Sequence, residues 1–367
     1  MAEVIRIGVI GVGMIGKSHL NGYQKVAGAQ VVAVADVNEE EARRVAASHG
    51  IEQVYGDFRD LLARDEIDAV DVCLHNNLHA PVTIAALEAG KHVYCEKPMA
   101  GAYADSAAML DCARRTGRQL HIQLSTLYSK EHKTAKRLIA AGALGKLYYA
   151  RSVGFRRRGR VWVDGYGTPA FVQSKQAAGG ALYDMGIYHM AQVLDLLGNP
   201  EVATVSGSTY QEIPMYEDRA QSAGFDVEEL GLGFVRLAGG ITMDVEEAWA
   251  MHYDGSESSK VLGSLGGLKL NPLTFYSTVA DVETSASLEL GGADYRWRQC
   301  EPDYSAYDGS QEHWIAALTG RVPLLPTAEI ALNVSLISEG IYLSQQLSRE
   351  VTRDEIVERS VSKALKV

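Results

Sequence analysis

The sequence predicts a protein of two α/β domains, the first with a doubly wound parallel sheet and the second of α+β type with a mostly antiparallel open sheet. In the first 125 residues, short apolar runs alternate with helical patterns. A glycine-rich turn follows the first of these runs, and beyond residue 125 strand patterns follow one another without helices between them. Because 367 residues suffice for two ordinary domains, we expect domains at 1–125 and 126–367.

The elements of the first domain follow from the spacing of its apolar residues. Near-continuous valine and isoleucine runs linked by helices are typical of a parallel sheet covered on both faces. We expect strands at 4–10, 31–35, 69–74, 92–95 and 119–123, and helices at 16–26, 39–49, 80–89 and 104–116.

The second domain has a different pattern. A helix is expected at 131–141, followed by strands at 147–155 and 241–249. In the last of these, apolar residues alternate with polar ones, which is typical of antiparallel strands with one packed face. An open sheet with an exposed face usually finds a partner, so we expect a homodimer or a homotetramer.

Composition narrows the class of protein. With 47% hydrophobic and 22% charged residues the chain is globular, and its formal charge of −11 argues against nucleic acid or an anionic membrane as the main partner. No apolar run is long enough for a membrane span, and Glu3 and Arg6 interrupt the apolar N-terminal stretch, so a cytoplasmic protein is expected. The four cysteines lack metal-ligand spacing, which predicts reduced, mostly buried thiols and no metal site.

The glycine-rich turn predicts a dinucleotide site. Gly11, Gly13 and Gly16 form G-x-G-x-x-G between a predicted strand and a predicted helix, so the amides around Met14 and Ile15 would bind a pyrophosphate. Asp36 ends the next strand, where a carboxylate accepts hydrogen bonds from the adenosine ribose. Since that carboxylate would repel a 2′-phosphate, NAD is favoured, although NADP remains possible.

A lysine is expected beside the reacting carbon. Lys97 follows the strand at 92–95 and precedes Pro98. Ligands of doubly wound sheets bind outside the carboxyl ends of the strands, so this lysine is expected to face the cofactor. Desolvation there would lower its pKa and allow it to take part in proton transfer. An ordinary surface lysine in a loop is the alternative.

Five further motifs follow the glycine turn along the chain. They are Asn76-Asn77-Leu78-His79, Gly90-Lys91-His92-Val93, Glu96-Lys97-Pro98, Ala141-Gly142-Ala143-Leu144-Gly145-Lys146 and Gly179-Gly180-Ala181-Leu182-Tyr183-Asp184-Met185-Gly186. The order of these motifs resembles that of a known family, the Gfo/Idh/MocA oxidoreductases, which include glucose–fructose oxidoreductase and inositol dehydrogenase. The resemblance covers about the first 200 residues, and 327–344 looks like the family's late helix.

The resemblance implies a nicotinamide held between the domains and a set of site residues. It implies that Lys97 orients the substrate hydroxyl, that Asp184 contacts the substrate, and that the residue four positions later is the acid/base. That residue is Tyr188, with His189 directly after it. On one helix Asp184 and Tyr188 would share a face, which favours Tyr188, and the Lys97 cation would stabilise its phenolate. The cofactor-binding residues implied around this crevice are Leu74, His75, Asn76, His79, Glu96 and Lys97.

An arginine-rich segment at 156–160 gives further candidates for substrate binding. As a loop over the cleft, it would hold a polyol with an arginine and aromatic side chains. The alternative is a solvated, salt-bridged loop or a contact between subunits. The candidates are Arg158, Trp162, Tyr166 and Lys175.

Together these observations predict an NAD(H)-dependent dehydrogenase acting on a secondary hydroxyl of a sugar, cyclitol or sugar derivative. Two alternatives remain open. One is glycoside cleavage by transient oxidation with retained NAD, as in some relatives. The other is a non-catalytic sensor of a dinucleotide or sugar.

Overall fold

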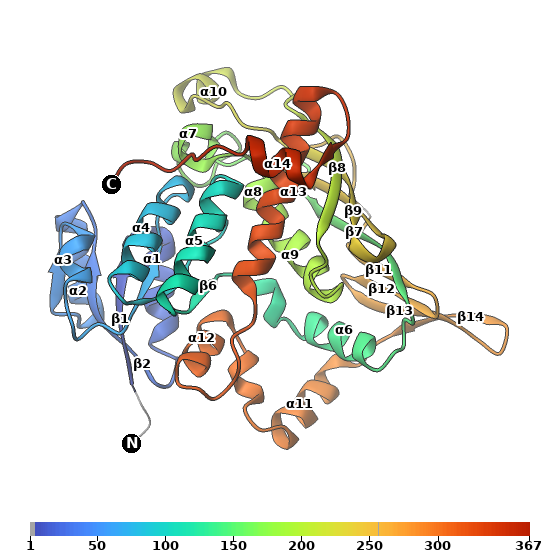
Figure 1. Ribbon diagram of the computed structural model, residues 1–367, viewed down its shortest axis with the longest axis horizontal. Coiled ribbons are helices and arrows are strands. Elements are labelled where there is room, and N and C mark those ends of the chain that lie inside the picture. Colours follow the sequence, from blue (N-terminus) through green and yellow to red (C-terminus); the bar gives the residue numbers. More distant parts are fainter. Residues whose placement is uncertain (1–3, 256) are drawn as a thin grey trace.

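A computed structural model describes residues 4–255 and 257–367 and contains two sheets side by side (Figure 1). The first sheet has six strands in the order β3-β2-β1-β4-β5-β6, and every pairing in it is parallel. Its strands are β1 (Ile5–Ile10), β2 (Ala29–Ala35), β3 (Gln53–Tyr55), β4 (Ala69–Val72), β5 (His92–Cys95) and β6 (Leu120–Ile122). The predicted doubly wound domain is confirmed.

The helices of this domain are close to those predicted. Helix α1 covers 14–23 where 16–26 was predicted, and α4 begins four residues before the predicted start. Helix α3 and strand β3 were not predicted because both are very short. The helices are α1 (Met14–Tyr23), α2 (Glu39–His49), α3 (Phe58–Leu62), α4 (Asn76–Glu88) and α5 (Tyr103–Thr116).

The second sheet has nine strands in the order β14-β13-β12-β11-β7-β10-β9-β8-β15. All its pairings are antiparallel except β7 with β10, which confirms the mostly antiparallel prediction. Its strands are β7 (Leu147–Phe155), β8 (Val202–Tyr210), β9 (Leu230–Leu237), β10 (Ile241–Ala248), β11 (Lys260–Gly263), β12 (Gly266–Leu270), β13 (Leu273–Val279), β14 (Val282–Ser287) and β15 (Val351–Thr352).

Helices pack against one face of this sheet. Helix α13 lies along β8, and α9 packs on β7, so the apolar side chains of these strands are buried beneath them. The helices are α6 (Lys130–Ala140), α7 (Ser174–Ala177), α8 (Ala181–Asp184), α9 (Gly186–Leu196), α10 (Glu217–Ala223), α11 (Leu290–Cys300), α12 (Ser310–Leu318), α13 (Thr327–Leu347) and α14 (Arg353–Arg359).

Late segments of the chain return to the first domain. Trp314 and Ile315 of α12 pack in the same buried cluster as Ile7 and Leu20. The C-terminal segment runs back past α7 toward α4 (Figure 1), where the Leu365 amide donates to the Asn77 carbonyl oxygen at 2.9 Å. Segments that follow residue 126 therefore pack on both sheets, and a boundary near residue 125 stays a prediction.

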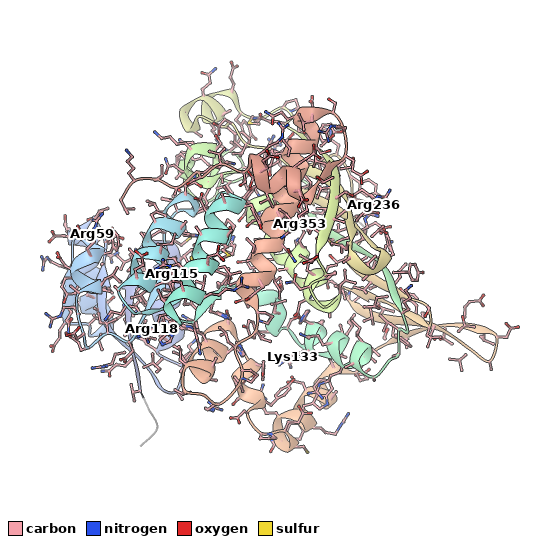
Figure 2. All side chains as sticks on the ribbon, viewed as in Figure 1. Arg59, Arg115, Arg118, Lys133, Arg236 and Arg353 are labelled. Atoms are coloured by element: carbon pink, nitrogen blue, oxygen red, sulfur yellow. The ribbon has the colours of Figure 1, made fainter. Side chains whose placement is uncertain are left out.

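Charged side chains are spread over the surface and many are paired (Figure 2). Arg59, Arg115 and Arg236, which are labelled there, form ion pairs with Asp57, Glu88 and Glu350. Within the described residues, no helix combines the length and the apolar character that a membrane span requires. The cysteines are free thiols, with Cys73, Cys95 and Cys112 buried and Cys300 exposed, as predicted.

Candidate active site

The glycine-rich turn has the shape that a pyrophosphate needs. Gly11 has a φ of +94°, and a Cβ there would collide with the Cys73 carbonyl oxygen. At Gly16 a Cβ would collide with the Gly11 carbonyl oxygen, so helix and strand can pack this closely only without side chains. Gly13, by contrast, faces open space at the start of α1. Met14 and Ile15 in the first turn are also exposed, so the amide end of α1 is free to receive phosphates.

Asp36 lies beside this turn at the end of β2. Its Oδ2 accepts a hydrogen bond from the Val12 amide at 2.8 Å, and its Oδ1 accepts one from the Asn38 amide at 2.9 Å. These bonds fix the carboxylate at the mouth of the turn, the position at which it would meet an adenosine ribose. The residues around the turn therefore fit a dinucleotide.

The predicted cofactor residues after β4 fall into two groups. Leu74 and His75 are half-buried at the strand end, and the His75 ring packs edge-on against Phe171 with centroids 5.4 Å apart. His79 is instead fully buried, with its ring nitrogens 3.0 Å from the Leu74 carbonyl oxygen and 2.7 Å from that of Pro98. It ties the two loops together.

Asn76 also holds the scaffold together. It is buried, and its Nδ2 donates to the Ala177 carbonyl oxygen at 2.8 Å, which links α4 to the segment before Gly179. That Asn76 and His79 touch the cofactor stays a prediction. Both side chains are held by hydrogen bonds to residues elsewhere in the sequence, and a local sequence motif does not reveal such bonds.

A buried set of charges lies behind Lys97. The His19 imidazole of α1 sits between Asp71 and Glu96, at 2.8 Å and 2.9 Å. Burial disfavours its charge, but the pKa of His19 is raised because Asp71 is in contact with it. Glu96 then accepts a hydrogen bond from the Lys97 backbone amide at 3.0 Å, so this buried network fixes the loop that carries the lysine. Sequence reasoning did not find His19.

Part of this network consists of side chains of the kinds that bind metal ions. His19, Asp71 and Cys73 lie close enough together to hold an ion. However, both imidazole nitrogens are engaged by carboxylates, and burial raises the pKa of the Cys73 thiol well above its ordinary value. The network is complete as a set of ion pairs, and we assign it no metal.

Lys97 and Asp184 form the centre of the site. The Lys97 Nζ lies 3.0 Å from Asp184 Oδ1 and 3.2 Å from the Asp184 carbonyl oxygen. The other carboxylate oxygen, Oδ2, accepts a hydrogen bond from the Trp249 indole at 2.9 Å. This arrangement joins the end of β5 to α8 and to the end of β10. Trp249 was not among the predicted residues.

The ion pair corrects the expected direction of the lysine pKa. Burial lowers the pKa of Lys97, but the nearby carboxylates, Asp184 first, outweigh it and raise the pKa above its ordinary value. Burial likewise opposes ionisation of Asp184, while the Lys97 cation lowers its pKa. Lys97 is therefore an ammonium that donates hydrogen bonds, and the expected desolvated, easily neutralised amine is wrong for the unliganded protein.

Tyr188 lies on the other side of the lysine. Its ring centroid is 4.9 Å from the Lys97 Nζ, and its hydroxyl is 3.4 Å from Gln123 Oε1 at the end of β6. Helices α8 and α9 are separated by Met185, so Asp184 and Tyr188 do not share one continuous helix, yet both reach the same ammonium. Burial raises the pKa of Tyr188 more than the lysine lowers it, so the phenol is protonated at neutral pH.

His189 points to a different partner. Its Nδ1 is 2.9 Å from Glu247 Oε2 on β10. Burial disfavours the imidazolium, but the Glu247 carboxylate raises the pKa of His189 above its ordinary value. Tyr188 and His189 thus belong to two separate clusters, and the one that contains Lys97 includes Tyr188.

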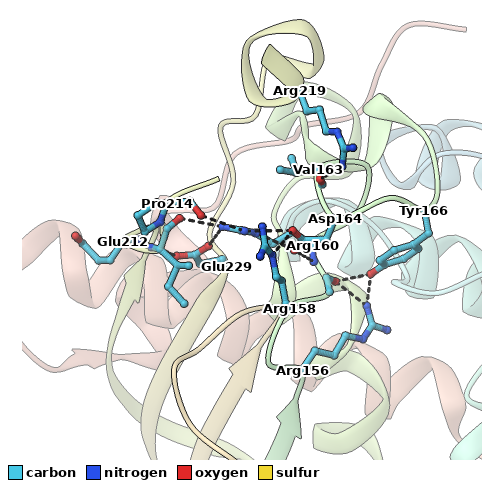
Figure 3. A network of polar contacts seen from close by, with 12 residues as sticks. Arg156, Arg158, Arg160, Val163, Asp164, Tyr166, Glu212, Pro214, Arg219 and Glu229 are labelled. Carbon is cyan, nitrogen blue, oxygen red and sulfur yellow. Dashed lines mark hydrogen bonds and ion pairs between the residues drawn. The ribbon is translucent and has the colours of Figure 1, made fainter. Parts of the chain in front are cut away.

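The arginine-rich loop forms a network of hydrogen bonds and ion pairs (Figure 3). Arg160 is fully buried between Asp164 and Glu229, at 2.9 Å and 3.0 Å. Arg158, a predicted substrate ligand, is 3.3 Å from Asp164 and so faces the loop itself.

Arg156, which was not among the chosen candidates, approaches the site instead. Its Nη1 is 3.7 Å from Asp184 Oδ2, and it also contacts the hydroxyl of Tyr166. Tyr166 donates to the Gly159 carbonyl oxygen at 2.6 Å. Of the remaining candidates, Trp162 is partly exposed and Lys175 is exposed without a side-chain contact to the cluster.

A doubly wound domain with a phosphate-binding turn, and an ammonium at the carboxyl edge of its sheet, define a nicotinamide-dependent oxidoreductase. Comparison with protein families agrees. The family described as "Oxidoreductase family, NAD-binding Rossmann fold" matches residues 5–124, and the "GFO/IDH/MocA C-terminal domain" matches residues 132–269. The chain belongs to the Gfo/Idh/MocA family and is an NAD-binding oxidoreductase.

Curated relatives include dehydrogenases. The D-glucoside 3-dehydrogenase of Escherichia coli K12 is 28% identical over 356 residues, which cover 95% of this chain and 97% of that protein. The myo-inositol 2-dehydrogenase of Thermotoga maritima is 33% identical over 147 residues, 40% of this chain and 44% of that protein.

Solved structures share the fold along nearly the whole chain. A levoglucosan dehydrogenase in complex with NADH and levoglucosan superposes with a TM-score of 0.77 at 23% identity, over 95% of this chain and 99% of that one. An NAD-binding oxidoreductase from Klebsiella pneumoniae gives the same values. At this identity the likeness concerns the fold.

Proposed function

We propose that the protein is an NAD(H)-dependent dehydrogenase that interconverts a secondary hydroxyl and a keto group on a sugar, cyclitol or sugar derivative. The observation that carries the proposal is the Lys97–Asp184 ion pair with Tyr188 beside it, at the edge of the sheet next to the dinucleotide turn. The relatives named above act on glucosides and inositol, which supports a polyhydroxylated substrate.

Lys97 is suited to hold the reacting oxygen. An ammonium has three donors, and two of them are used by Asp184 Oδ1 and the Asp184 carbonyl oxygen. The third is left for the substrate hydroxyl. Because Asp184 and Glu96 keep the pKa of Lys97 raised, the cation persists and stabilises the negative charge that develops on that oxygen.

Tyr188 is suited to move the proton. In the direction of ketone reduction its phenol donates a proton to the developing alkoxide. In the direction of oxidation the phenolate accepts the hydroxyl proton, and the Lys97 cation 4.9 Å from the ring centroid favours that phenolate. Bound NAD supplies the hydride acceptor, while the chain holds the substrate and handles the proton.

The test is an absorbance assay for NADH formation by the purified protein. Cyclitols, aldoses, anhydrosugars and glycosides are each offered with NAD and with NADP. We expect one substrate class to reduce the cofactor, with NAD preferred because Asp36 stands at the ribose position. Tight dinucleotide binding without net reduction by any of these compounds would overturn the proposal. It would favour either glycoside cleavage with retained NAD, which product analysis would reveal, or a sensor.

A further inference from the structure

His189 and Glu247 form a dyad that the proposed hydroxyl chemistry does not use. Glu247 is fully buried, accepts a hydrogen bond from the Ser152 hydroxyl at 3.0 Å, and lies 2.9 Å from His189 Nδ1. Because Nδ1 faces the carboxylate, the other ring nitrogen, Nε2, is left over, and it has no hydrogen-bond partner among the described residues. The His189 side chain is 29% exposed, so the dyad opens to solvent through its imidazole.

The strand register relates this dyad to the centre of the site. Strands β7 and β10 are parallel, with Gly154 opposite Glu247. Arg156 directly follows β7 and Trp249 directly follows β10, and the Arg156 amide still donates to the Ala248 carbonyl oxygen. Because side chains two residues apart on an extended chain point to the same face, Gly154 and Arg156 share a face with Glu247 and Trp249. Arg156 and Trp249 approach Asp184, while Gly154 and Glu247 adjoin His189. His189 therefore contacts the two chain segments one two-residue step before the residues that contact Asp184.

That step has the size of a sugar ring. Two residues along a strand span roughly 6.6 Å, which is comparable with the width of a monosaccharide ring and its hydroxyl groups. A substrate whose reacting hydroxyl lies at Lys97 and Asp184 would then bring its far side to His189 Nε2. The site has two polar ends separated by one ring.

Gly154 is what allows the imidazole to lie there. A Cβ at this position would collide with His189 Nδ1 and with a Glu247 carboxylate oxygen. The backbone of β7 therefore approaches the dyad closely, and the ring is fixed between strand and helix. A donor fixed in this way loses little conformational entropy when it binds a ligand.

We propose that His189, held by Glu247, is a specificity-determining residue that donates a hydrogen bond from Nε2 to a hydroxyl on the far side of the substrate ring. The chain therefore selects six-membered polyhydroxylated rings, either pyranosides or cyclitols, over shorter open-chain polyols. This inference rests on the proposed dehydrogenase function. It gives His189 a role in substrate binding and leaves hydroxyl proton transfer to Tyr188.

The experiment compares substrate analogues with a protein variant. Steady-state kinetics of NADH formation are measured for the wild type and for His189→Asn, using the best ring substrate of the assay above and its monodeoxy analogues. His252→Asn is the matched control, because this histidine of the same domain is exposed and makes no hydrogen bond to His189 or Glu247 among the described residues. NADH binding, followed by fluorescence, reports whether the first domain is intact.

With the parent substrate, His189→Asn is expected to lower kcat/KM about tenfold, a typical effect for one hydrogen bond to a charged donor, mostly through KM. With one monodeoxy analogue the variant should change kcat/KM less than twofold, since the hydroxyl that His189 binds is already absent. His252→Asn should match the wild type throughout.

The possible failures are distinguishable. If no ring substrate reduces NAD, the proposed function itself fails. If the wild type is active but His189→Asn has the same effect on the parent and on every deoxy analogue, or none, the inference is wrong. Should His189→Asn not fold, Glu247→Gln takes its place, because it keeps an acceptor for Nδ1 while removing the charge. The same pattern across the analogues, with a smaller loss, is then expected, and its absence overturns the inference.

Discussion

Lys97 is the residue whose removal tests the chemistry most directly. Lys97→Met keeps the length of the side chain and removes the ammonium that holds Asp184 at 3.0 Å. Because positioned groups of this kind contribute about 10²- to 10⁴-fold, kcat/KM for the sugar should fall by that range. NADH affinity, measured by fluorescence titration, should change little, since the turn and Asp36 are untouched.

Lys25→Met is the control for this prediction. Lys25 is exposed and makes no ion pair with Asp184 among the described residues, so its replacement should leave turnover unchanged. A folded Lys97→Met variant with wild-type rates would rule out the proposed role of the lysine.

Tyr188 makes the rate of oxidation depend on pH. Burial raises the pKa of its phenol above the usual value of about 10. Oxidation requires the phenolate, so kcat/KM for oxidation should rise with pH and should still be rising near pH 10, since this ratio reports the free enzyme. Ketone reduction requires the phenol and should show no such rise.

Tyr188→Phe is the variant that assigns this pH dependence. It should lower the rate about 10²-fold or more and flatten the alkaline rise, as seen in pH profiles of both directions. If Tyr188→Phe keeps the wild-type profile while His189→Asn loses it, the acid/base is His189.

Among the elements, the short helix α8 depends on one buried carboxylate. Glu228 accepts hydrogen bonds from the amides of Gly180 and Leu182, at 2.7 Å and 2.9 Å, and from the Tyr342 hydroxyl. These bonds fix the start of the helix that ends in Asp184. The position of Asp184 is therefore set by a residue that lies two positions before β9.

Glu228→Ala should loosen that helix. It leaves two buried amides without their acceptor, which costs about 1–3 kcal/mol for each unsatisfied group, so the midpoint of thermal unfolding should fall. At a temperature where the variant is folded, KM for the sugar should rise while NADH affinity stays the same. Tyr342→Phe removes only a donor to the carboxylate and should have a smaller effect. An unchanged KM in folded Glu228→Ala would contradict the role of Glu228 in positioning Asp184.

Elements with regular apolar periods were predictable from the sequence, and those that depend on distant partners were not. The boundaries of β5 and β7 match the prediction. Helix α4 begins at Asn76, earlier than its apolar pattern, because Asn76 and Asn77 bond to carbonyl oxygens about a hundred residues away. Strand β3 has three half-buried residues and no period to detect.

The same contrast holds for the site. Lys97, Asp184 and Tyr188 belong to local motifs, and the structure brings all three together. Trp249 and Glu247 join them only because β10 pairs with β7 and passes under α8 and α9. The one signal in the sequence that could have pointed to Arg156 was the alternation of side chains along β7. Arg156 continues the face of β7 that carries Ser152 and Gly154, whereas Arg158 lies in the loop beyond.

At the scale of the whole molecule, one face of the second sheet is covered by no helix of the described residues. The register places Phe234 of β9 opposite Asp244 of β10 and Ser206 of β8 on this face. Phe234, Tyr210 of β8 and Tyr276 of β13 are between 37% and 43% exposed there. Aromatic side chains on an open sheet are typical of an interface, and closed symmetric assemblies are the usual outcome.

We therefore expect a homodimer or homotetramer joined through this face, measurable by size-exclusion chromatography with light scattering. Phe234→Glu places a charge in the middle of the face, next to Asp244, and should shift the protein toward monomers. Tyr295→Glu, on α11 and 65% exposed, is the control and should leave the assembly unchanged. If the wild type is a monomer at micromolar concentration, the uncovered face is simply solvated. If Tyr295→Glu dissociates the assembly and Phe234→Glu does not, the interface lies on the α11 side of the molecule.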